Sequence, residues 1–369
     1  MVSSSQDLAK VKQFRYGVLV EENGFDGASV DHEAMTVGDG FDRTASHLYV
    51  LLNGAIAASM RMLPGGAATG DAEIAAHYGL DSFEAFPPKA LSFTDQLVVA
   101  KAHQATKIPS LLSAAAFKLS RNSGALFDFT HTSPGLVGLY EKLGYRRYKD
   151  NFDHPELGLR VPMILVMDDL QHLVDLRSPF AAIARDFKLR EKAASWFHKT
   201  FPDACAHNAK ALRDETSFWE FLTNRLHENP LHGIPLFAGL NHRQAMKMLR
   251  NTSVMKLAAG DTLLRAGDMG EEMFVLLSGI MCVTADRSEV PLARFGRGAI
   301  LGEVAYLSEM PRTATVKALD DSEVLVLTQN RLQLLVEEAP ETAAVVLLNL
   351  SRLLCDRIRA TNELVQDMS

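Results

Sequence analysis

Cysteine is scarce in this chain. The 369 residues include three cysteines, Cys205, Cys282 and Cys355, which lie far apart and outside any metal-ligand spacing. An odd number at such distances does not suggest a disulfide framework or a cysteine-based metal site. This usage is typical of a reducing compartment. We therefore expect a cytoplasmic protein without a bound metal.

Excess positive charge and long apolar runs are also lacking. The chain has 38 Lys and Arg against 45 Asp and Glu, a formal net charge of −7, which provides no electrostatic footprint for nucleic acid. Its first residues, MVSSSQDLAKVKQ, do not have the basic-then-apolar order of a secretion signal. The apolar runs are shorter than the roughly 20 residues of a membrane span. We expect neither a nucleic-acid partner nor a membrane span.

The residues that are present have the composition of a folded globular protein. Apolar residues make up 47% of the chain and charged residues 22%, which is ordinary for this class. A length of 369 residues argues for two domains rather than one core. The element pattern places these domains at residues 1–168 and 233–369, with a helical connector at residues 169–232. The expected fold class is α+β.

The C-terminal segment alternates short apolar runs with glycine turns. This pattern covers KLAAGDTLLRAGDMGEEMFVLLSGIMCVTAD, residues 256–286, and predicts a small β-barrel or jelly roll. A further hairpin follows over residues 316–328, with its turn near Asp320 and Asp321. From Gln329 the apolar period becomes helical. We expect a β-domain that ends in helices.

The motif LGEVAYLSEMPRTATV, residues 301–316, contains the chemistry of this domain. Gly302 and Glu303 open a short helical turn, and Arg312 follows nine residues after the Glu. An Arg offers a cyclic phosphate a cation with fork geometry, and a helix N-terminus opened by glycine offers backbone N–H groups. A carboxylate such as Glu303 accepts a hydrogen bond from a ribose hydroxyl. The motif indicates a pocket for a cyclic nucleotide.

The motif resembles the phosphate-binding cassette of the cyclic-nucleotide-binding family, and the likeness extends over residues 234–364. The resemblance implies that Glu303 meets the ribose and that Arg312 meets the phosphate. It also implies a lid helix around residues 352–359 that closes over the base. The residues assigned to the ligand are Gly302, Glu303, Val304, Ala305, Arg312, Thr313 and Ala314.

Two questions stay open for this domain. Thr313 suits cGMP, because a hydroxyl can meet the guanine amino group of a syn base, and it suits cAMP equally. Such a domain can also persist as an interaction module without a ligand, since Gly-Glu and Pro-Arg pairs are ordinary turn chemistry.

The apolar stripe of residues 347–358 offers either a homodimer surface or a cover for the pocket. A DNA-reading helix-turn-helix has no room after the lid, so we expect the regulated activity upstream.

The N-terminal domain alternates strand and helix signals. Its clearest element is a hairpin over residues 47–62, joined by Asn53 and Gly54, a favoured two-residue turn. Residues 89–100 predict a strand, and residues 108–125 predict a helix that stops at a glycine. Together these signals predict a mixed sheet with flanking helices.

This succession resembles the GNAT acyltransferase superfamily at two places. Residues 97–112, LVVAKAHQATKIPSLL, match the strand, loop and helix where that family cradles the donor's pyrophosphate. Residues 139–148, LYEKLGYRRY, match the later helix and strand where a tyrosine protonates the departing thiolate. Tyr140 holds that place. The resemblance implies an acyl-CoA or acyl-carrier-protein thioester as donor. The residues assigned to the donor are Val98, Val99, Gln104, Thr106 and Lys107.

The donor loop departs from the family pattern, because it has no glycine. The family reads Arg/Gln-Gly-x-Gly-x-Gly/Ala where residues 104–109 read Gln-Ala-Thr-Lys-Ile-Pro. Glycines allow a close approach of backbone to phosphate. We expect looser phosphate binding or help from the Lys107 charge. A carrier-protein donor, which presents one phosphate, fits the same loop.

A second resemblance is to the autoinducer synthases and related N-acyl amino acid synthases. Residues 14–25 and 41–65 look like the opening of those enzymes, and by position Arg15, Asp42 and Arg61 frame the amine acceptor and acyl chain. The acidic-x-Ser-Arg element of the autoinducer synthases is not preserved, since residues 93–96 read Phe-Thr-Asp-Gln. The resemblance therefore favours a general N-acyltransferase over homoserine-lactone synthesis.

Amide formation from a thioester requires a deprotonated amine, a polarised carbonyl and a protonated leaving thiolate. We expect Asp95 or Asp42 to take the amine proton through water, and backbone N–H groups near Val98 and Val99 to hold the carbonyl oxygen. Structural alternatives remain for each side chain. Asp95 can be a solvated strand residue, Arg61 and Asp42 a structural ion pair, and Tyr140 a packing residue.

The leading interpretation is a cyclic-nucleotide-regulated N-acyltransferase that acts on a small-molecule amine. One alternative is a protein lysine acetyltransferase under the same control, since the domain pair resembles actinobacterial enzymes that place the sensor first. Another alternative is a non-catalytic effector whose GNAT-like domain binds a ligand or partner. In the leading interpretation, a shift of the lid helix releases an occluded acyltransferase cleft through the connector.

Overall fold

A computed structural model describes residues 1–2, 4–104, 106–187, 191–206, 215–250, 252–285, 290–308 and 310–367, with side chains to residue 363 in the last helix. The chain divides into two compact units. One comprises Met1–Phe152 and Arg160–Asn208, and the other comprises Asp153–Leu159 and Ala209–Ser369. The segment predicted as a connector, residues 169–232, contributes helices to both units.

The first unit is built on a mixed seven-stranded sheet with the order β3-β4-β5-β6-β9-β7, which β8 joins through β9. The strands are β3 Ser46–Leu52, β4 Ala55–Pro64, β5 Leu91–Val99, β6 Phe127–Thr132, β7 Arg146–Arg147, β8 Phe152–His154 and β9 Gly158–Val166. The predicted hairpin is confirmed as β3 and β4. Its turn residues Asn53 and Gly54 have φ angles of 51° and 85°, as a two-residue hairpin turn requires.

Strands β5 and β6 pair briefly and then separate. Their parallel register joins Leu91 to Phe127, Ser92 to Asp128 and Phe93 to Phe129. Beyond these pairs β5 remains paired with β4, and β6 pairs antiparallel with β9. We call this place, where the two strands diverge after Phe93 and Phe129, the strand split.

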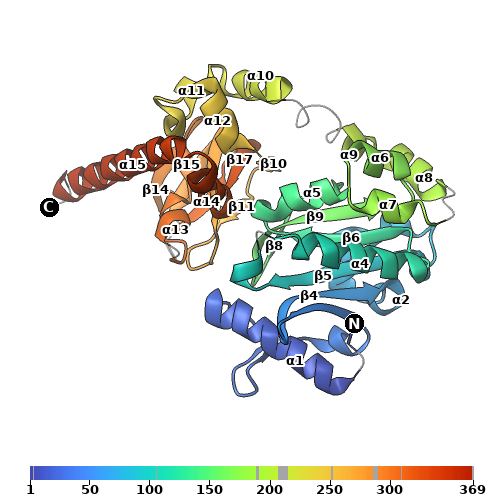
Figure 1. Ribbon diagram of the computed structural model, residues 1–369. Helices are drawn as coiled ribbons and strands as arrows, with labels where there is room; N and C mark the ends of the chain where they lie inside the picture. Colours follow the sequence, from blue (N-terminus) through green and yellow to red (C-terminus); the bar gives the residue numbers. More distant parts are fainter. Residues whose placement is uncertain are drawn as a thin grey trace. The chain divides into compact units, whose positions relative to one another are not determined.

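Helices cover both faces of this sheet (Figure 1). Ala58 and Met60 of β4 face α4, where they pack with Leu112 and Ala116, whereas Arg61 points towards α1. The helices of the unit are α1 Ser5–Tyr16, α2 Gly65–Ala68, α3 Ala72–Tyr78, α4 Ile108–Asn122, α5 Val137–Leu143, α6 Leu170–Asp175, α7 Phe180–Ala184, α8 Lys192–Thr200 and α9 Pro202–Ala206. Shorter elements are the π-helical turn η1 Gly17–Glu22, the strands β1 Val30–Asp31 and β2 Thr36–Val37, and the 3-10 turns η2 Gly40–Arg43, η3 Leu80–Phe83, η4 Pro88–Ala90, η5 Lys101–His103 and η6 Pro134–Leu136.

The second unit contains two four-stranded sheets, β10-β17-β12-β15 and β11-β16-β13-β14. The strands are β10 Ser253–Leu257, β11 Thr262–Leu264, β12 Glu272–Ser278, β13 Met281–Thr284, β14 Pro291–Phe295, β15 Ile300–Leu301, β16 Thr315–Ala318 and β17 Ser322–Thr328. The predicted jelly roll is confirmed. The predicted barrel is not closed in the residues described, because hydrogen bonding ends at β10 and β15 in one sheet and at β11 and β14 in the other.

Helices enclose the apolar core of the second unit. They are α10 Glu215–Leu226, α11 Pro230–Gly233, η7 Pro235–Phe237, α12 His242–Leu249, α13 Glu303–Ser308, α14 Gln329–Glu338 and α15 Pro340–Asp367. The switch to helix at Gln329 is confirmed, since α14 begins there. The first half of α15 packs on the core through Val346 and Leu350, and the C-terminal end of the helix extends beyond the sheets (Figure 1). Among the residues described, no helix has the length and apolar character needed to cross a membrane.

Candidate functional site

Glu303 and Arg312 are both buried in the second unit, with exposed fractions of 3% and 6%. Glu303 begins α13 directly after Gly302, whose φ of 80° lies in the left-handed region that favours glycine. Two backbone bonds position Arg312, since its N–H donates to the carbonyl of Asp268 and its carbonyl accepts from Gly267, both at 2.8 Å. Local backbone geometry therefore determines the positions of Glu303 and Arg312.

The guanidinium of Arg312 has partners within the protein. Its Nη1 donates to the carbonyls of Glu272 and Gly302 at 2.7 and 3.0 Å, and its Nη2 donates to Glu272 Oε2 at 3.3 Å. Burial lowers the pKa of Arg312, but a guanidinium stays charged at neutral pH. Two glycines leave room for the group, because an added Cβ would lie 2.5 Å from Nη2 at Gly270 and 2.9 Å from Nη1 at Gly302.

Glu303 is paired with the last helix. Arg357 of α15 donates through Nη1 to Glu303 Oε1 at 2.5 Å and through Nη2 to the carbonyl of Ile300. The guanidinium also lies over the ring of Phe295, 4.8 Å from its centroid. Arg357 belongs to the segment expected to act as a lid. Its pairing with the carboxylate was not predicted, because sequence spacing does not reveal a contact between residues 54 positions apart.

The other cassette residues differ in exposure. Ala305 is buried, whereas Val304 is 37% exposed. Thr313 is exposed and Ala314 is half-buried. The structure therefore brings Gly302, Glu303 and Arg312 together and leaves Thr313 exposed.

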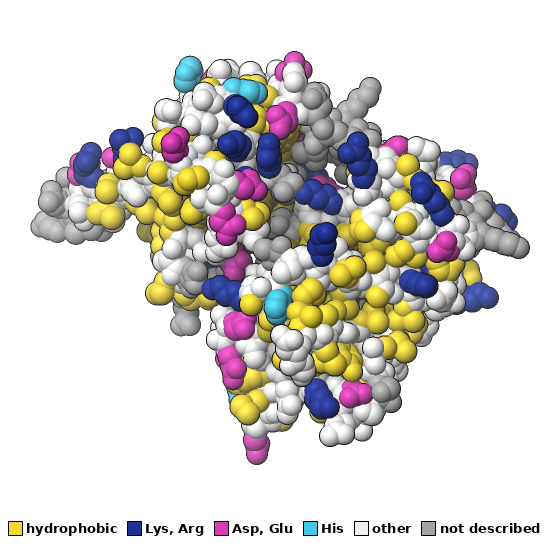
Figure 2. Space-filling view, viewed as in Figure 1, with side chains coloured by type: hydrophobic (Ala, Val, Ile, Leu, Met, Phe, Trp, Pro, Cys, Tyr) yellow, Lys and Arg dark blue, Asp and Glu magenta, His cyan; other side chains and the backbone are white. Residues whose placement is uncertain are grey.

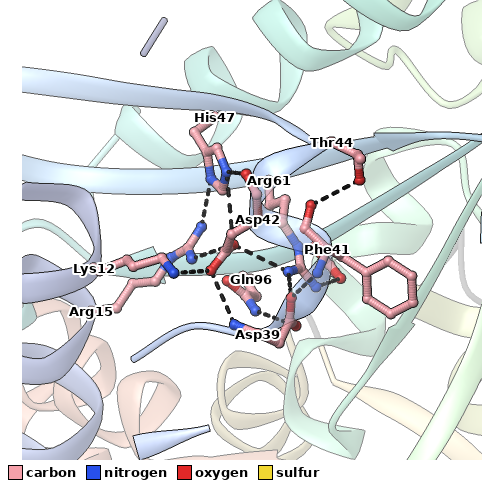
Figure 3. Close-up of polar contacts among 10 residues, drawn as sticks. Lys12, Arg15, Asp39, Phe41, Asp42, Thr44, His47, Arg61 and Gln96 are labelled. Atoms are coloured by element: carbon pink, nitrogen blue, oxygen red, sulfur yellow. Dashed lines mark hydrogen bonds and ion pairs between the residues drawn. The ribbon is translucent and has the colours of Figure 1, made fainter. Parts of the chain in front are cut away.

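A network of charged side chains lies in the first unit between α1, η2 and the strands β3, β4 and β5 (Figure 3). Asp42 occupies its centre. Its Oδ1 accepts from Arg15 Nη1 at 3.1 Å and from Arg61 Nη1 at 3.2 Å, and its Oδ2 lies 3.1 Å from Lys12 Nζ. Arg15 is fully buried and Asp42 is 2% exposed. The sequence analysis assigned Arg15, Asp42 and Arg61 to acceptor binding. The network connects all three, because Asp42 accepts from both arginines.

Arg61 links Asp42 to two more accessible carboxylates. It donates through Nε and Nη2 to the two oxygens of Asp95 at 2.8 and 2.7 Å, and through Nη1 to Asp39 Oδ1 at 2.5 Å. The side chains of Asp95 and Asp39 are 25% and 34% exposed. Asp39 was not predicted. The sequence contained one indication of its position, because Asp39 lies three residues before Asp42 and Asp is a favoured helix N-cap residue.

The protonation states in this network follow from its contacts. Burial alone would raise the pKa of the Asp42 carboxyl, but Arg15, Lys12 and Arg61 together lower it to about 2. Asp42 is therefore a carboxylate at neutral pH and a poor proton acceptor. Burial lowers the pKa of His47, whose Nδ1 accepts from Arg15 Nη2 at 2.9 Å while its Nε2 donates to the carbonyl of Asp42 at 2.9 Å. His47 is thus a neutral imidazole.

Tyr140 lies beside the strand split. Its side chain is 4% exposed, and its phenol hydrogen-bonds Thr130, the first residue of β6 after the last pair with β5. Burial raises the pKa of Tyr140 to about 12. The phenol therefore remains protonated throughout the physiological range and is available as a hydrogen-bond donor.

The predicted donor loop leads into α4. Ile108 N donates to Thr106 Oγ1 at 3.2 Å, and Pro109 has no N–H, so the first turn of α4 offers few backbone donors. Gln104 Nε2 donates to the carbonyl of Val99 at 3.5 Å. Lys107 is exposed. Ala105 lies outside the described residues.

Val98 and Val99 lie on β5, opposite Ser59 and Ala58 of β4. Because N–H groups of successive strand residues point to opposite sides, one of the two points away from β4. The edge of β5 that pairs with β4 contains a bulge at Gln96, with a φ of 48°. This geometry supplies a backbone donor on the side of β5 that faces the strand split.

Comparison with known families assigns both units. The acetyltransferase (GNAT) domain model matches residues 14–114, and the cyclic nucleotide-binding domain model matches residues 254–339. The chain therefore contains an acetyltransferase-type domain followed by a cyclic nucleotide-binding domain, as the sequence predicts.

Individual relatives match the second unit. A cAMP-dependent protein kinase regulatory subunit of Hypocrea atroviridis is 31% identical over 116 residues, which are 31% of this chain and 25% of that protein. A cyclic nucleotide-gated potassium channel of Rhizobium etli is 31% identical over 113 residues, 31% of each chain. The chain thus spans about a quarter to a third of the length of these relatives.

Solved structures were compared as well. A cyclic nucleotide-binding domain from Methylobacillus flagellatus is 24% identical and aligns with a TM-score of 0.37, covering 41% of this chain and 85% of that chain. The catabolite activator protein of Thermus thermophilus is 26% identical, with a TM-score of 0.33, covering 36% and 62%.

Proposed function

We propose that this protein is an N-acyltransferase whose activity is controlled by a cyclic nucleotide. The observation that carries the proposal is the strand split with Tyr140 beside it, in a unit that matches an acetyltransferase domain. Diverging strands leave backbone N–H groups without a strand partner, and such groups can hold a thioester arm and its carbonyl oxygen. The cassette with Glu303 and Arg312 supplies the regulatory site.

The reaction forms one bond and breaks one. The lone pair of a neutral amine attacks the thioester carbon, the C–N bond forms, and the C–S bond breaks to release a thiolate. Tyr140 donates a hydrogen bond to the departing sulfur. With a pKa of about 12 against about 8.5 for an ordinary thiol, the phenol stabilises the thiolate by a hydrogen bond and keeps its own proton. The amine proton leaves to water or to a carboxylate at the site.

The acceptor amine has a site at the accessible edge of the charged network. Asp39 and Asp95 are its partly exposed carboxylates, and each can accept from an ammonium group. Arg61 orients both carboxylates. Arg15 and Asp42 are buried behind them and act as supports, because their contacts are internal. In this proposal Asp95 is the stronger candidate for the proton acceptor, since Asp42 has so low a pKa.

The donor is an acyl-CoA or an acyl carrier protein thioester. Lys107 is the exposed cation at the loop before α4. Apolar side chains gather over β4 and α4 (Figure 2), where Leu111 is 64% exposed and Leu97 and Val99 are half-buried. An apolar surface next to β5 favours a donor with a longer acyl chain over acetyl, because such a surface gains from contact with methylene groups.

A non-catalytic effector is the second candidate, and one observation favours it. The first turn of α4 lacks the backbone donors that would cradle a pyrophosphate, since Thr106 occupies the Ile108 amide and Pro109 has none. In that case the first unit binds a ligand or a protein partner without turnover. A protein lysine acceptor, in place of a small amine, remains an alternative for the catalytic case.

Calorimetric titration with cAMP and with cGMP tests the regulatory half of the proposal. Dissociation constants in the micromolar range or below are expected for one or both. Release of free thiol from acetyl-CoA and palmitoyl-CoA, followed with a thiol reagent in the presence of pooled amino acids or a lysine peptide, tests the catalytic half. Nucleotide binding without thiol release from either CoA thioester or from a palmitoyl-loaded acyl carrier protein would support the effector and contradict the enzyme.

A further inference from the structure

The face of β6 that lies under α5 is polar and buried. Phe127 and Phe129 join the aromatic core on one side of the strand, whereas Asp128, Thr130 and Thr132 alternate onto the other side, each at most 3% exposed. Polar groups are costly to bury unless hydrogen bonds compensate. This stretch of polar groups begins at the strand split.

Asp128 is held there by hydroxyl groups. Its Oδ1 accepts from Ser92 Oγ at 2.5 Å and from Thr94 Oγ1 at 2.9 Å, and its Oδ2 accepts from the Tyr145 phenol at 2.5 Å. Within the described part of the chain, no Lys, Arg or His forms an ion pair with it. A buried carboxylate with three hydroxyl donors and no cation is an unusual structural element.

The contacts of Asp128 span the strand split. Ser92 is its partner in the β5–β6 register, and Thr94 is the first residue of β5 after the last pair. Tyr145 follows α5, and its ring meets that of Tyr140 edge-on, with centroids 5.2 Å apart. Asp128 therefore connects both diverging strands to the tyrosine pair.

We propose that Asp128 is a positioning residue for acyl transfer, which acts through Tyr145 to hold the Tyr140 phenol at the strand split. This inference rests on the proposed function, because it assigns a task to Tyr140. The hydrogen bond to Asp128 holds the Tyr145 ring in place. The Tyr140 ring packs against Tyr145 and is therefore held in position as well. A hydrogen-bond donor must be placed within a few tenths of an ångström to stabilise a thiolate.

The charge of Asp128 has a second effect on the same phenol. Burial is the main reason for the raised pKa of Tyr140, and the carboxylates of Asp128 and Asp95 raise it further, while Thr130 lowers it. Thr130 of β6 and the ring of Tyr145 contact Tyr140. Asp128 of β6 and Asp95 of β5 act on the phenol through their charge, and Asp95 is itself paired with Arg61. Burial raises the pKa of the Asp128 carboxyl, and its three hydroxyl donors act in the opposite direction. When this carboxyl is ionised, its charge raises the pKa of Tyr140, so Asp128→Asn should lower that pKa, and displacing Tyr145 alters the surroundings of the phenol.

Two variants test the proposal, Asp128→Asn and Tyr145→Phe. Ultraviolet difference titration against Tyr140→Phe isolates the Tyr140 phenol, and its pKa is expected to fall in Asp128→Asn. We expect kcat to fall about 10- to 100-fold in both variants, with KM for the donor nearly unchanged and with a shift of the alkaline limb of the pH–kcat profile. Combining Tyr145→Phe with Tyr140→Phe should add little, because both act on one group.

Tyr148→Phe is the matched control. It removes a phenol hydrogen bond in the same unit, to the carbonyl of Tyr78 at 2.6 Å, without touching Asp128. If Asp128→Asn and Tyr145→Phe reduce thermal stability but leave kcat, its pH profile and the Tyr140 titration unchanged, Asp128 stabilises the fold and does not position Tyr140. If the wild-type chain transfers no acyl group, the proposed function fails, and the Tyr140 titration by itself decides whether Asp128 controls that phenol.

Discussion

At the scale of single residues, we expect nucleotide binding to depend on the guanidinium of Arg312. A hydrogen bond to a charged group is worth about 1.5–3 kcal/mol, so Arg312→Ala should weaken nucleotide binding by roughly 10- to 150-fold. Calorimetric titration with cAMP and cGMP measures the change. Arg225→Ala is the control, because Arg225 pairs with Glu323 elsewhere in the same unit. Equal losses in both variants would show that the effect is not specific to the cassette.

Asp42 predicts a dependence of stability on pH in the first unit. Its pKa is about 2 in the folded protein against an ordinary 3.8, so its contribution is complete above pH 4 and is lost as the pH falls through 2. Linkage gives about 2 kcal/mol in total, of which about 1 kcal/mol is lost by pH 3. Asp42→Asn should abolish this part of the pH dependence.

Tryptophan fluorescence can report this effect. The chain has two tryptophans, Trp196 in the core of the first unit and Trp219 against the core of the second. In a Trp219→Phe background, urea unfolding at pH 5 and pH 3 follows the first unit. A wild-type chain that loses no more stability than Asp42→Asn between these values would contradict the prediction.

Residue roles were predictable where a motif places them close together. Gly302, Glu303 and Arg312 lie within eleven positions of each other, and one turn of helix with one loop brings them to one site. The partners of Arg61 and Arg15 lie 19 to 34 positions away. Lys12, Asp39 and His47 were therefore missed, because only the folded sheet brings them together. Asp128 was missed for the same reason, since in the sequence it is one of several polar residues in β6, which reads Phe-Asp-Phe-Thr-His-Thr.

At the scale of elements, we expect α15 to compete with the nucleotide for Glu303, because Arg357 is paired with this carboxylate. The pair of Arg357 with Glu303 must yield if a ribose 2′-hydroxyl is to donate to the same oxygen. We expect Arg357→Gln to tighten cAMP binding by about 3- to 10-fold, equal to about 0.6–1.4 kcal/mol. The 2′-deoxy analogue of cAMP should bind the two chains equally. Weaker binding of both nucleotides by Arg357→Gln would indicate that Arg357 contacts the base instead.

Elements with a clear period and a turn signal were predictable. The β3–β4 hairpin, the helix α4 and the switch at Gln329 were each predicted. The strand split could not be located from the sequence, because strand pairing is a tertiary property that local sequence does not encode. The open double sheet differs from the predicted barrel for the same reason, since alternation along each strand is identical in the two arrangements.

At the scale of the whole molecule, nucleotide binding should alter acyl transfer. A coupling free energy of about 1–3 kcal/mol corresponds to a change of about 5- to 150-fold in rate or affinity. Initial rates of thiol release with and without saturating nucleotide measure it. Arg312→Ala should retain the basal rate and lose the response. A response that persists in Arg312→Ala would place the nucleotide effect outside the cassette, and tight binding with unaltered wild-type rates would mean that the two units are uncoupled.

The internal partners of Arg312 and Glu303 have a consequence for the history of such a gene. Both side chains are satisfied by the protein itself, so the domain does not depend on its nucleotide for its shape. A lineage can therefore lose the signal and keep the fold. At Gly270 a single base change in the codon introduces alanine, whose methyl group would displace the guanidinium. Proteins with this substitution would retain the fold of the cyclic nucleotide-binding domain and lose the response to the nucleotide.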